Sequence, residues 1–93
     1  MNPKQKRIWD EVIERDNGLC FCGAAGCEVH HIIPRSRCSE NLWTLQNMRV
    51  VCWACHHSGI EGRTSEILIE MIERFPEYEN WYRDRAEFRG YLE

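Results

Sequence analysis

The residues best able to do chemistry are gathered in the middle of the sequence. All six cysteines and all four histidines lie between positions 20 and 57 of the 93-residue chain. Cys52 and Cys55 are separated by two residues, a spacing that lets two thiolates on one tight turn bind a single tetrahedral zinc ion. A second pair must complete such a cage, and we assign Cys20 and Cys22 to it. Cys27 is an alternative to either member of that second pair.

These cysteines are better explained as metal ligands than as disulfides. The chain has no apolar run of about 18 residues, and its N-terminal stretch lacks the apolar segment of a signal peptide. We therefore expect no membrane segment and a cytoplasmic, intracellular protein, in which thiols stay reduced. The alternative is that the cysteines are small buried apolar residues. A closed cage of four cysteines leaves no open coordination position, so its zinc would be structural.

The histidines suit a different task. Hydrolysis of a phosphodiester needs a base that activates water, a Lewis acid that stabilises charge on the phosphate, and a group that holds the base. A histidine is a suitable base at neutral pH. A divalent ion held by one or two histidines keeps open positions for phosphate and water. The candidates for these tasks are His30, His31, Asn47 and His56.

Four short motifs follow one another in a recognisable order. They are CFCG at 20–23, HHIIP at 30–34, Asn47, and CWACH at 52–56. Together they resemble the HNH endonuclease family in its zinc-bound form, over about residues 15–58. The resemblance implies a ββα-metal core and metal-dependent hydrolysis of phosphodiester bonds in DNA, by nicking or by double-strand cutting.

The same resemblance implies a role for each candidate. His31 would be the general base, and His30 and His56 would bind a catalytic divalent ion (Mg²⁺, Mn²⁺, Ni²⁺ or Zn²⁺). Asn47 would fix the loop and orient His31, so that His31, Asn47 and His56 form the catalytic set. Asn41 is the alternative to Asn47. We prefer Asn47 because it lies five residues before Cys52, the first residue of the Cys52–Cys55 pair.

Four further residues near these positions are harder to assign. Arg35 and Arg37 are candidates for holding phosphate, with a solvated loop as the alternative. His57 is either exposed or a substitute for His56. Cys38 receives no role.

The elements that must position these residues are short. Helical spacing of apolar residues predicts a brace helix within residues 1–16. β-branched residues predict strands over 27–33 and 48–51, the second turning into a short helix. Residues 64–90 predict two C-terminal helices. We expect a single small α+β domain over 1–93, with a treble-clef-like core stapled by the four-cysteine zinc site.

Charge limits the DNA contact that we expect. The net charge is −3, and residues 64–93 carry eight acidic and four basic side chains. Phosphate contacts should therefore be local, and nonspecific affinity for DNA modest and salt-sensitive. The acidic C-terminal helices are expected to bind a protein partner or a second copy.

Two further readings of the function follow. The resemblance allows a phage-type, packaging-associated nuclease, which would work in the host cytoplasm. The alternative to a nuclease is a non-catalytic zinc-binding module that interacts with nucleic acid or protein, because a fold does not dictate a function.

Overall fold

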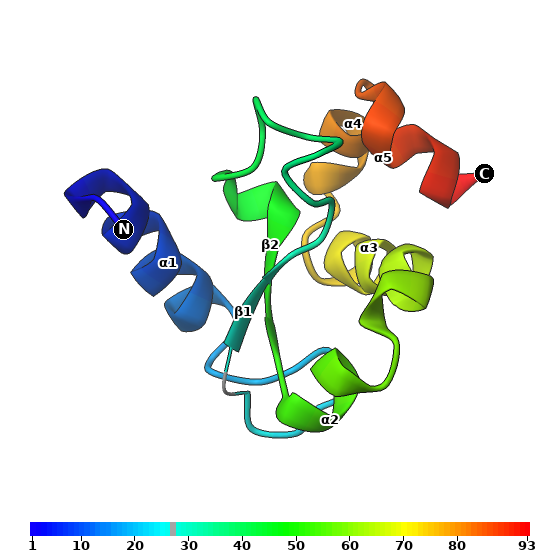
Figure 1. Ribbon diagram of the computed structural model, residues 1–93. Helices are drawn as coiled ribbons and strands as arrows, with labels where there is room; N and C mark the ends of the chain where they lie inside the picture. Colours follow the sequence, from blue (N-terminus) through cyan, green and yellow to red (C-terminus); the bar gives the residue numbers. More distant parts are fainter. Residues whose placement is uncertain (27) are drawn as a thin grey trace.

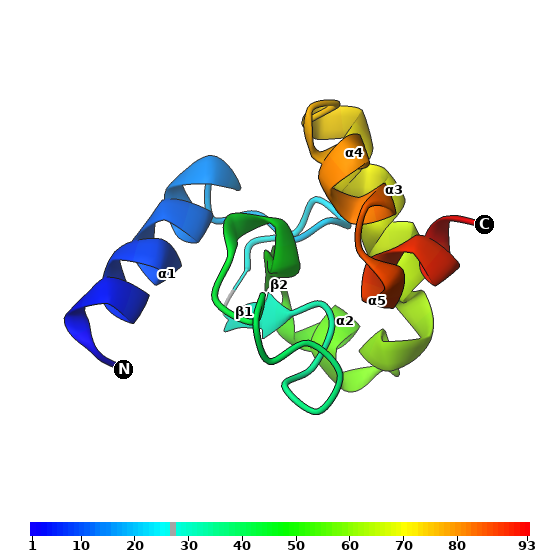
Figure 2. The ribbon, with the colours of Figure 1, turned by 90° about the horizontal axis from the view of Figure 1, so that it is seen from above.

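Two short antiparallel strands form the centre of the computed structural model, which describes residues 1–26 and 28–93. Strand β1 (Glu28–His31) pairs with β2 (Met48–Val51) over all four residues of each strand. Helix α1 (Pro3–Arg15) lies on one side of this hairpin, and the C-terminal helices lie on the other (Figure 1). The view from above separates the same two sides (Figure 2).

Helix α1 is capped by its own sequence and packs on β2. The Asn2 side chain accepts a hydrogen bond from the Gln5 backbone N–H, and the Gln5 side chain accepts one from the Asn2 N–H. This capping box satisfies backbone donors that a helix start otherwise leaves unpaired. On the inner face of the helix, the fully buried Val12 packs with Met48 and Val50. The helix therefore braces one face of the hairpin.

Three helices cover the opposite face: α3 (Thr64–Arg74), α4 (Tyr78–Arg83) and α5 (Ala86–Arg89). The prediction of two C-terminal helices is wrong, because the chain leaves helical geometry again at Arg85, whose φ and ψ are −120° and 121°. The buried side chains of this layer, which share one hydrophobic cluster with Ile32 and Ile33, are Ile67, Leu68, Met71, Tyr82 and Phe88.

A buried carboxylate ties these layers to the hairpin. The fully buried Asp16 side chain pairs with Arg15 at 2.8 Å, with Arg49 at 2.9 Å and with Arg74 at 3.0 Å. Arg49 also donates two hydrogen bonds of 3.0 Å to Glu70. Burial acts to raise the pKa of Asp16, but the hydrogen bonds and charges of its neighbours outweigh it and hold the pKa below its usual value. The network joins the end of α1 to β2 and α3.

A tight turn precedes β1 and packs directly against β2. Leu19 and Ala25 form an isolated antiparallel bridge across this turn. At Gly26, a Cβ atom would lie 2.0 Å from Val50 Cγ1 and 3.2 Å from the Gly18 carbonyl oxygen. Only glycine fits so close an approach.

These elements confirm the predicted small α+β fold, with a two-stranded antiparallel hairpin among helices. Strand β2 has the predicted bounds, whereas β1 ends at His31, two residues earlier than predicted. Cys27, where the predicted first strand begins, lies outside the described residues. None of the helices in the described ranges is both long enough and apolar enough to span a bilayer.

Candidate metal centre and histidine pocket

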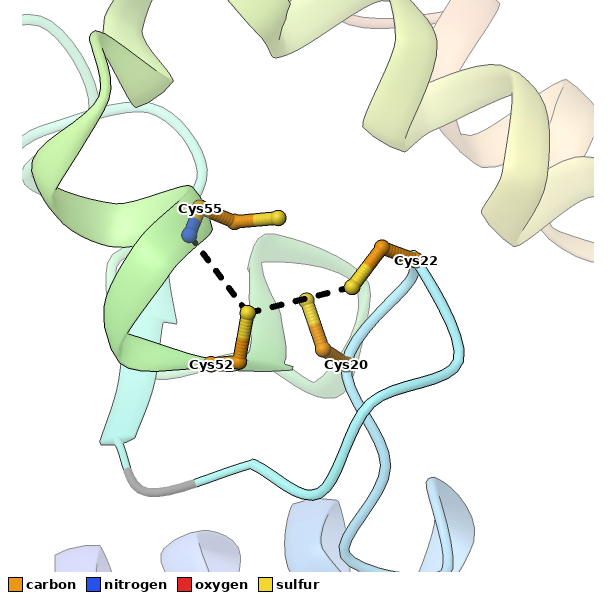
Figure 3. A group of neighbouring side chains, drawn as sticks. All are labelled: Cys20, Cys22, Cys52 and Cys55. Atoms are coloured by element: carbon orange, nitrogen blue, oxygen red, sulfur yellow. Dashed lines mark hydrogen bonds between the residues drawn. The ribbon is translucent and has the colours of Figure 1, made fainter.

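Four cysteine sulfur atoms meet between the first turn and the start of α2 (Trp53–His57). The Sγ atoms of Cys20, Cys22, Cys52 and Cys55 lie within 4.8 Å of one another, and Figure 3 shows the four side chains converging. Around a tetrahedral zinc ion with Zn–S bonds of about 2.3 Å, two sulfurs are about 3.8 Å apart. The Cys22 and Cys52 Sγ atoms are 3.8 Å apart. The cluster is therefore consistent with a structural zinc site; Cys27, the alternative ligand, is not among the described residues.

The thiols of this cluster differ in pKa. A hydrogen bond from the Cys55 backbone N–H to Cys52 Sγ, 3.4 Å long, is the main cause that lowers the pKa of Cys52 to about 7. Burial raises the pKa of Cys55 to about 12. Arg63 donates to Cys55 Sγ over 3.4 Å. Its positive charge favours the thiolate form, which is the form that binds a metal ion.

The candidate histidines His30, His31 and His56 line one open pocket beside β1. Neighbouring strand residues point to opposite faces, so His30 and His31 face apart. Both nevertheless line this pocket, together with residues of the loop that follows β1 and with His56 of α2. The pocket has a volume of about 430 Å³ and is lined by Val29, His30, His31, Pro34, Arg35, Leu42, Trp43 and His56.

A backbone carbonyl holds His31 in one tautomer. His31 Nδ1 lies 2.9 Å from the Leu42 carbonyl oxygen. Because a carbonyl only accepts, Nδ1 carries the proton and Nε2 keeps its lone pair. The ring also packs edge-on against Trp43, with the ring centroids 5.0 Å apart. Burial lowers the pKa of His31, so the ring is neutral at neutral pH.

Asn47 fastens the loop that carries this carbonyl. Its fully buried side chain accepts a hydrogen bond of 2.8 Å from the Ile33 N–H and donates one of 3.0 Å to the Ile33 carbonyl. The same Nδ2 lies 3.5 Å from the Leu42 oxygen. Asn47 thus reaches His31 through one shared carbonyl. Asn41, the alternative, instead donates to a carboxylate of α5 over 3.2 Å.

His30 and His56 approach each other between β1 and α2. Their rings stand edge to face with centroids 5.7 Å apart. Burial first, and the charge of His56 next, lower the pKa of His30 to about 4, so His30 is a neutral potential ligand. Glu28, His56 and His57 each offer one ligand atom, and these three atoms lie within 4.8 Å of one another.

The two candidate arginines have different surroundings. Arg35 is exposed on the histidine pocket. Arg37 donates to the Tyr91 hydroxyl over 2.6 Å and lies over the Tyr91 ring, beside a smaller pocket of about 140 Å³ that His30 and His31 also line. Cys38 is buried but is not one of the four clustered cysteines, and burial raises the pKa of its thiol.

Two groups at this site were missed by the sequence analysis. The Leu42 carbonyl is a backbone atom and leaves no side-chain signal. Glu28 did leave one, because it lies two positions before His30 and therefore on the same face of the strand.

A hairpin and a short helix joined by a four-cysteine cluster, with histidines at the hairpin's edge, define a small α+β metal-site domain. Residues 19–58 match the model of the family described as HNH endonuclease. This segment, somewhat under half of the 93-residue chain, is an HNH endonuclease family domain, and the resemblance read from the sequence is confirmed over it. The family implies a nucleic-acid substrate. Searches of curated proteins and of solved structures found no significant match.

Proposed function

We propose that this protein is a metal-dependent endonuclease that hydrolyses phosphodiester bonds in DNA. The family match supports the nuclease class. The single observation that carries the mechanism is the hydrogen bond between His31 Nδ1 and the Leu42 carbonyl. It leaves Nε2 of a neutral imidazole free to accept a proton from the attacking water. Asn47 supports this geometry by holding the same loop.

In this proposal His30 and His56 hold the catalytic divalent ion. Imidazole nitrogens suit several divalent metals, including zinc and nickel. When bound, the ion supplies a Lewis acid that stabilises charge on the phosphate. Arg35, exposed on the same pocket, supplies a guanidinium for a phosphate oxygen. The four cysteines hold a structural zinc that fixes α2, and with it His56.

Plasmid nicking by the purified protein tests this proposal. We expect nicking that depends on added Mg²⁺, Mn²⁺ or Ni²⁺ and that falls by about 10²- to 10⁴-fold in a His31→Ala variant. Added imidazole should restore part of the lost activity, since it can replace the missing base. Zinc content and circular dichroism should match the wild type, because His31 is not one of the four clustered ligands.

Other outcomes would redirect the assignment. Nicking that persists unchanged in His31→Ala would contradict the base. A wild-type protein that binds zinc and retains DNA on a gel, yet cleaves nothing under any metal, would support the non-catalytic zinc-binding module instead.

The role of the C-terminal helices stays a prediction. Residues 64–93 carry twice as many acidic as basic side chains, which favours a protein partner or a second copy over direct DNA binding. A phage-type, packaging-associated role is part of the same proposal. Co-purification and mass measurements of the full chain would test whether such a partner or dimer exists.

A further inference from the structure

We propose that Glu28 and His57 join His56 in binding a divalent cation. This ligand set differs from the His30–His56 pair of the proposed function, and it deepens that proposal by naming a carboxylate ligand and a second helical histidine. The metal site can be tested by binding alone, without any cleavage assay. Only its suggested part in catalysis rests on the proposed function.

The three side chains are close enough to share one ion. Glu28 Oε2 lies 2.5 Å from His56 Nδ1, and Glu28 Oε1 lies 3.8 Å from His57 Nε2. Ligand atoms bound to one small divalent ion at about 2.0–2.2 Å are separated by roughly 3–4 Å. A small adjustment of the flexible Glu28 side chain would therefore place all three groups around a single ion.

A buried nitrogen of His56 supports the presence of a cation at this position. His56 Nδ1 is buried and, among the described residues, has no hydrogen-bond partner, although the Glu28 carboxylate is near. The nitrogen and the oxygen are close but misaligned for a hydrogen bond. Burial of an unpaired polar atom is costly, and a cation between the two acceptors would satisfy both.

The fold brings these groups together from two elements. Glu28 and His30 lie on one face of β1, because they are two residues apart on a strand. Helix α2 presents His56 to this face, so His56 has Glu28 as one neighbour and the His30 ring, 5.7 Å away, as another. His57 stacks on the exposed ring of Trp53, with centroids 4.7 Å apart and planes at 27°. This stack holds the His57 ring beside Glu28. It also explains why a tryptophan that is 65% exposed stands at position 53.

The donor set indicates the class of ion. Two imidazoles and one carboxylate suit Zn²⁺, Mn²⁺, Co²⁺, Ni²⁺ or Fe²⁺ better than Mg²⁺, which prefers oxygen ligands. Three protein ligands leave coordination positions open for water or phosphate. The site would therefore differ in chemistry from the four-cysteine cluster, whose positions are all filled by the protein.

A cobalt titration tests the ligand set in zinc-loaded protein, meaning here protein that carries one zinc ion per chain, which fills the four-cysteine cluster and leaves the proposed site free. Co²⁺ at nitrogen and oxygen ligands gives weak visible bands, whereas Co²⁺ that displaces zinc from the cysteines gives strong thiolate charge-transfer absorption, so the two sites are distinguishable. Glu28→Gln and His57→Gln should each weaken cobalt binding by at least about tenfold relative to wild type. Glu61→Gln is the matched control. It removes one negative charge close to His30, as Glu28→Gln does, but removes no proposed ligand, so it should bind cobalt nearly as tightly as the wild type.

The outcomes separate this inference from the proposed function. The inference is overturned if Glu28→Gln and His57→Gln both bind cobalt with wild-type affinity. It is also overturned if the zinc-loaded wild type binds no cobalt, because Glu28 and His56 would then form an ordinary ion pair. If His30→Ala alone abolishes cobalt binding and nicking, the inference fails and the proposed function stands. If binding depends on Glu28 and His57 but no metal supports cleavage, the inference stands and the proposed function fails.

Discussion

A single carbonyl oxygen links the proposed base to its support. The Leu42 oxygen accepts a hydrogen bond of 2.9 Å from His31 and lies 3.5 Å from Asn47 Nδ2. The buried amide of Asn47 also closes the loop through both backbone groups of Ile33. We therefore propose that Asn47 is a positioning residue, which acts on the tautomer and direction of the His31 ring through the backbone.

Removal of the Asn47 side chain should lower both stability and activity. Asn47→Ala leaves the buried N–H and C=O of Ile33 unpaired, which should cost about 1–3 kcal/mol of unfolding free energy. Asn41→Ala deletes the same group at a partly exposed position and should cost about 0.5 kcal/mol or less. Urea unfolding of the zinc-loaded variants measures both. Equal losses would contradict the assignment, as would unchanged kcat in Asn47→Ala.

Local spacing could predict some residues of the site and not others. The CxxC spacing of Cys52 and Cys55 is set by one turn, so the sequence was sufficient to predict that these sulfurs share a site. The closeness of Glu28 to His56 and His57 depends on how α2 sits against β1. That placement is a tertiary property, and no spacing in the sequence encodes it.

At the scale of elements, the buried Asp16 network fixes how α1, β2 and α3 meet. Asp16 follows the last residue of α1, Arg49 lies in β2, and Glu70 and Arg74 lie in α3. Three arginines share two carboxylates, so the loss of one carboxylate leaves buried positive charge without compensation.

Asp16→Asn should therefore destabilise the fold, and the effect should depend on pH. At neutral pH we expect a loss of about 3 kcal/mol in unfolding free energy. The folded-state pKa of Asp16 lies below its ordinary value of 3.8, so its contribution is present above that value and is lost as the pH falls below it. The stability gap between wild type and Asp16→Asn should be constant above about pH 5 and should shrink in more acidic solution.

Denaturant unfolding over a pH series measures this gap. Asp10→Asn is the matched control, because Asp10 pairs with Lys6 at the exposed surface, and its loss should change stability by about 0.5 kcal/mol or less. A gap that widens in acid would contradict the sign derived for Asp16.

Element bounds were predictable where the signal is local. The run of β-branched residues in β2 and the capping of α1 by Asn2 both follow from neighbouring residues. The break between α4 and α5 did not follow, because apolar and aromatic residues recur through 78–90 at spacings that one continuous helix could also use. The chain bends there so that Tyr82 and Phe88 can both enter the core.

For the whole molecule, zinc is expected to contribute much of the folding free energy. Helix α2 has five residues, too few to be stable alone. It is capped by one clustered cysteine, Cys52, and contains another, Cys55, as well as His56. Structural zinc contributes on the order of 10 kcal/mol in small zinc domains.

Removal of zinc should therefore unfold the hairpin and α2. A chelator should lower the melting temperature sharply, and added zinc should restore it. Cys22→Ala should lose zinc, whereas Cys38→Ala should keep one zinc ion per chain, because Cys38 lies outside the cluster. Cys27→Ala decides the alternative ligand: retention of zinc supports the Cys20–Cys22 pair, and loss of zinc contradicts it.

The loop between the strands also rests on the end of the chain. Several hydrogen bonds join them, among them those from Arg37 to Tyr91 at 2.6 Å, from Asn41 to Glu87 at 3.2 Å, and from Tyr82 to the Gln46 carbonyl at 2.7 Å. The family match stops at residue 58. A fragment trimmed to that boundary would retain every motif residue and lose all three of these supports. We therefore expect that the shortest fragment able to hold this loop in place extends beyond the segment that matches the family.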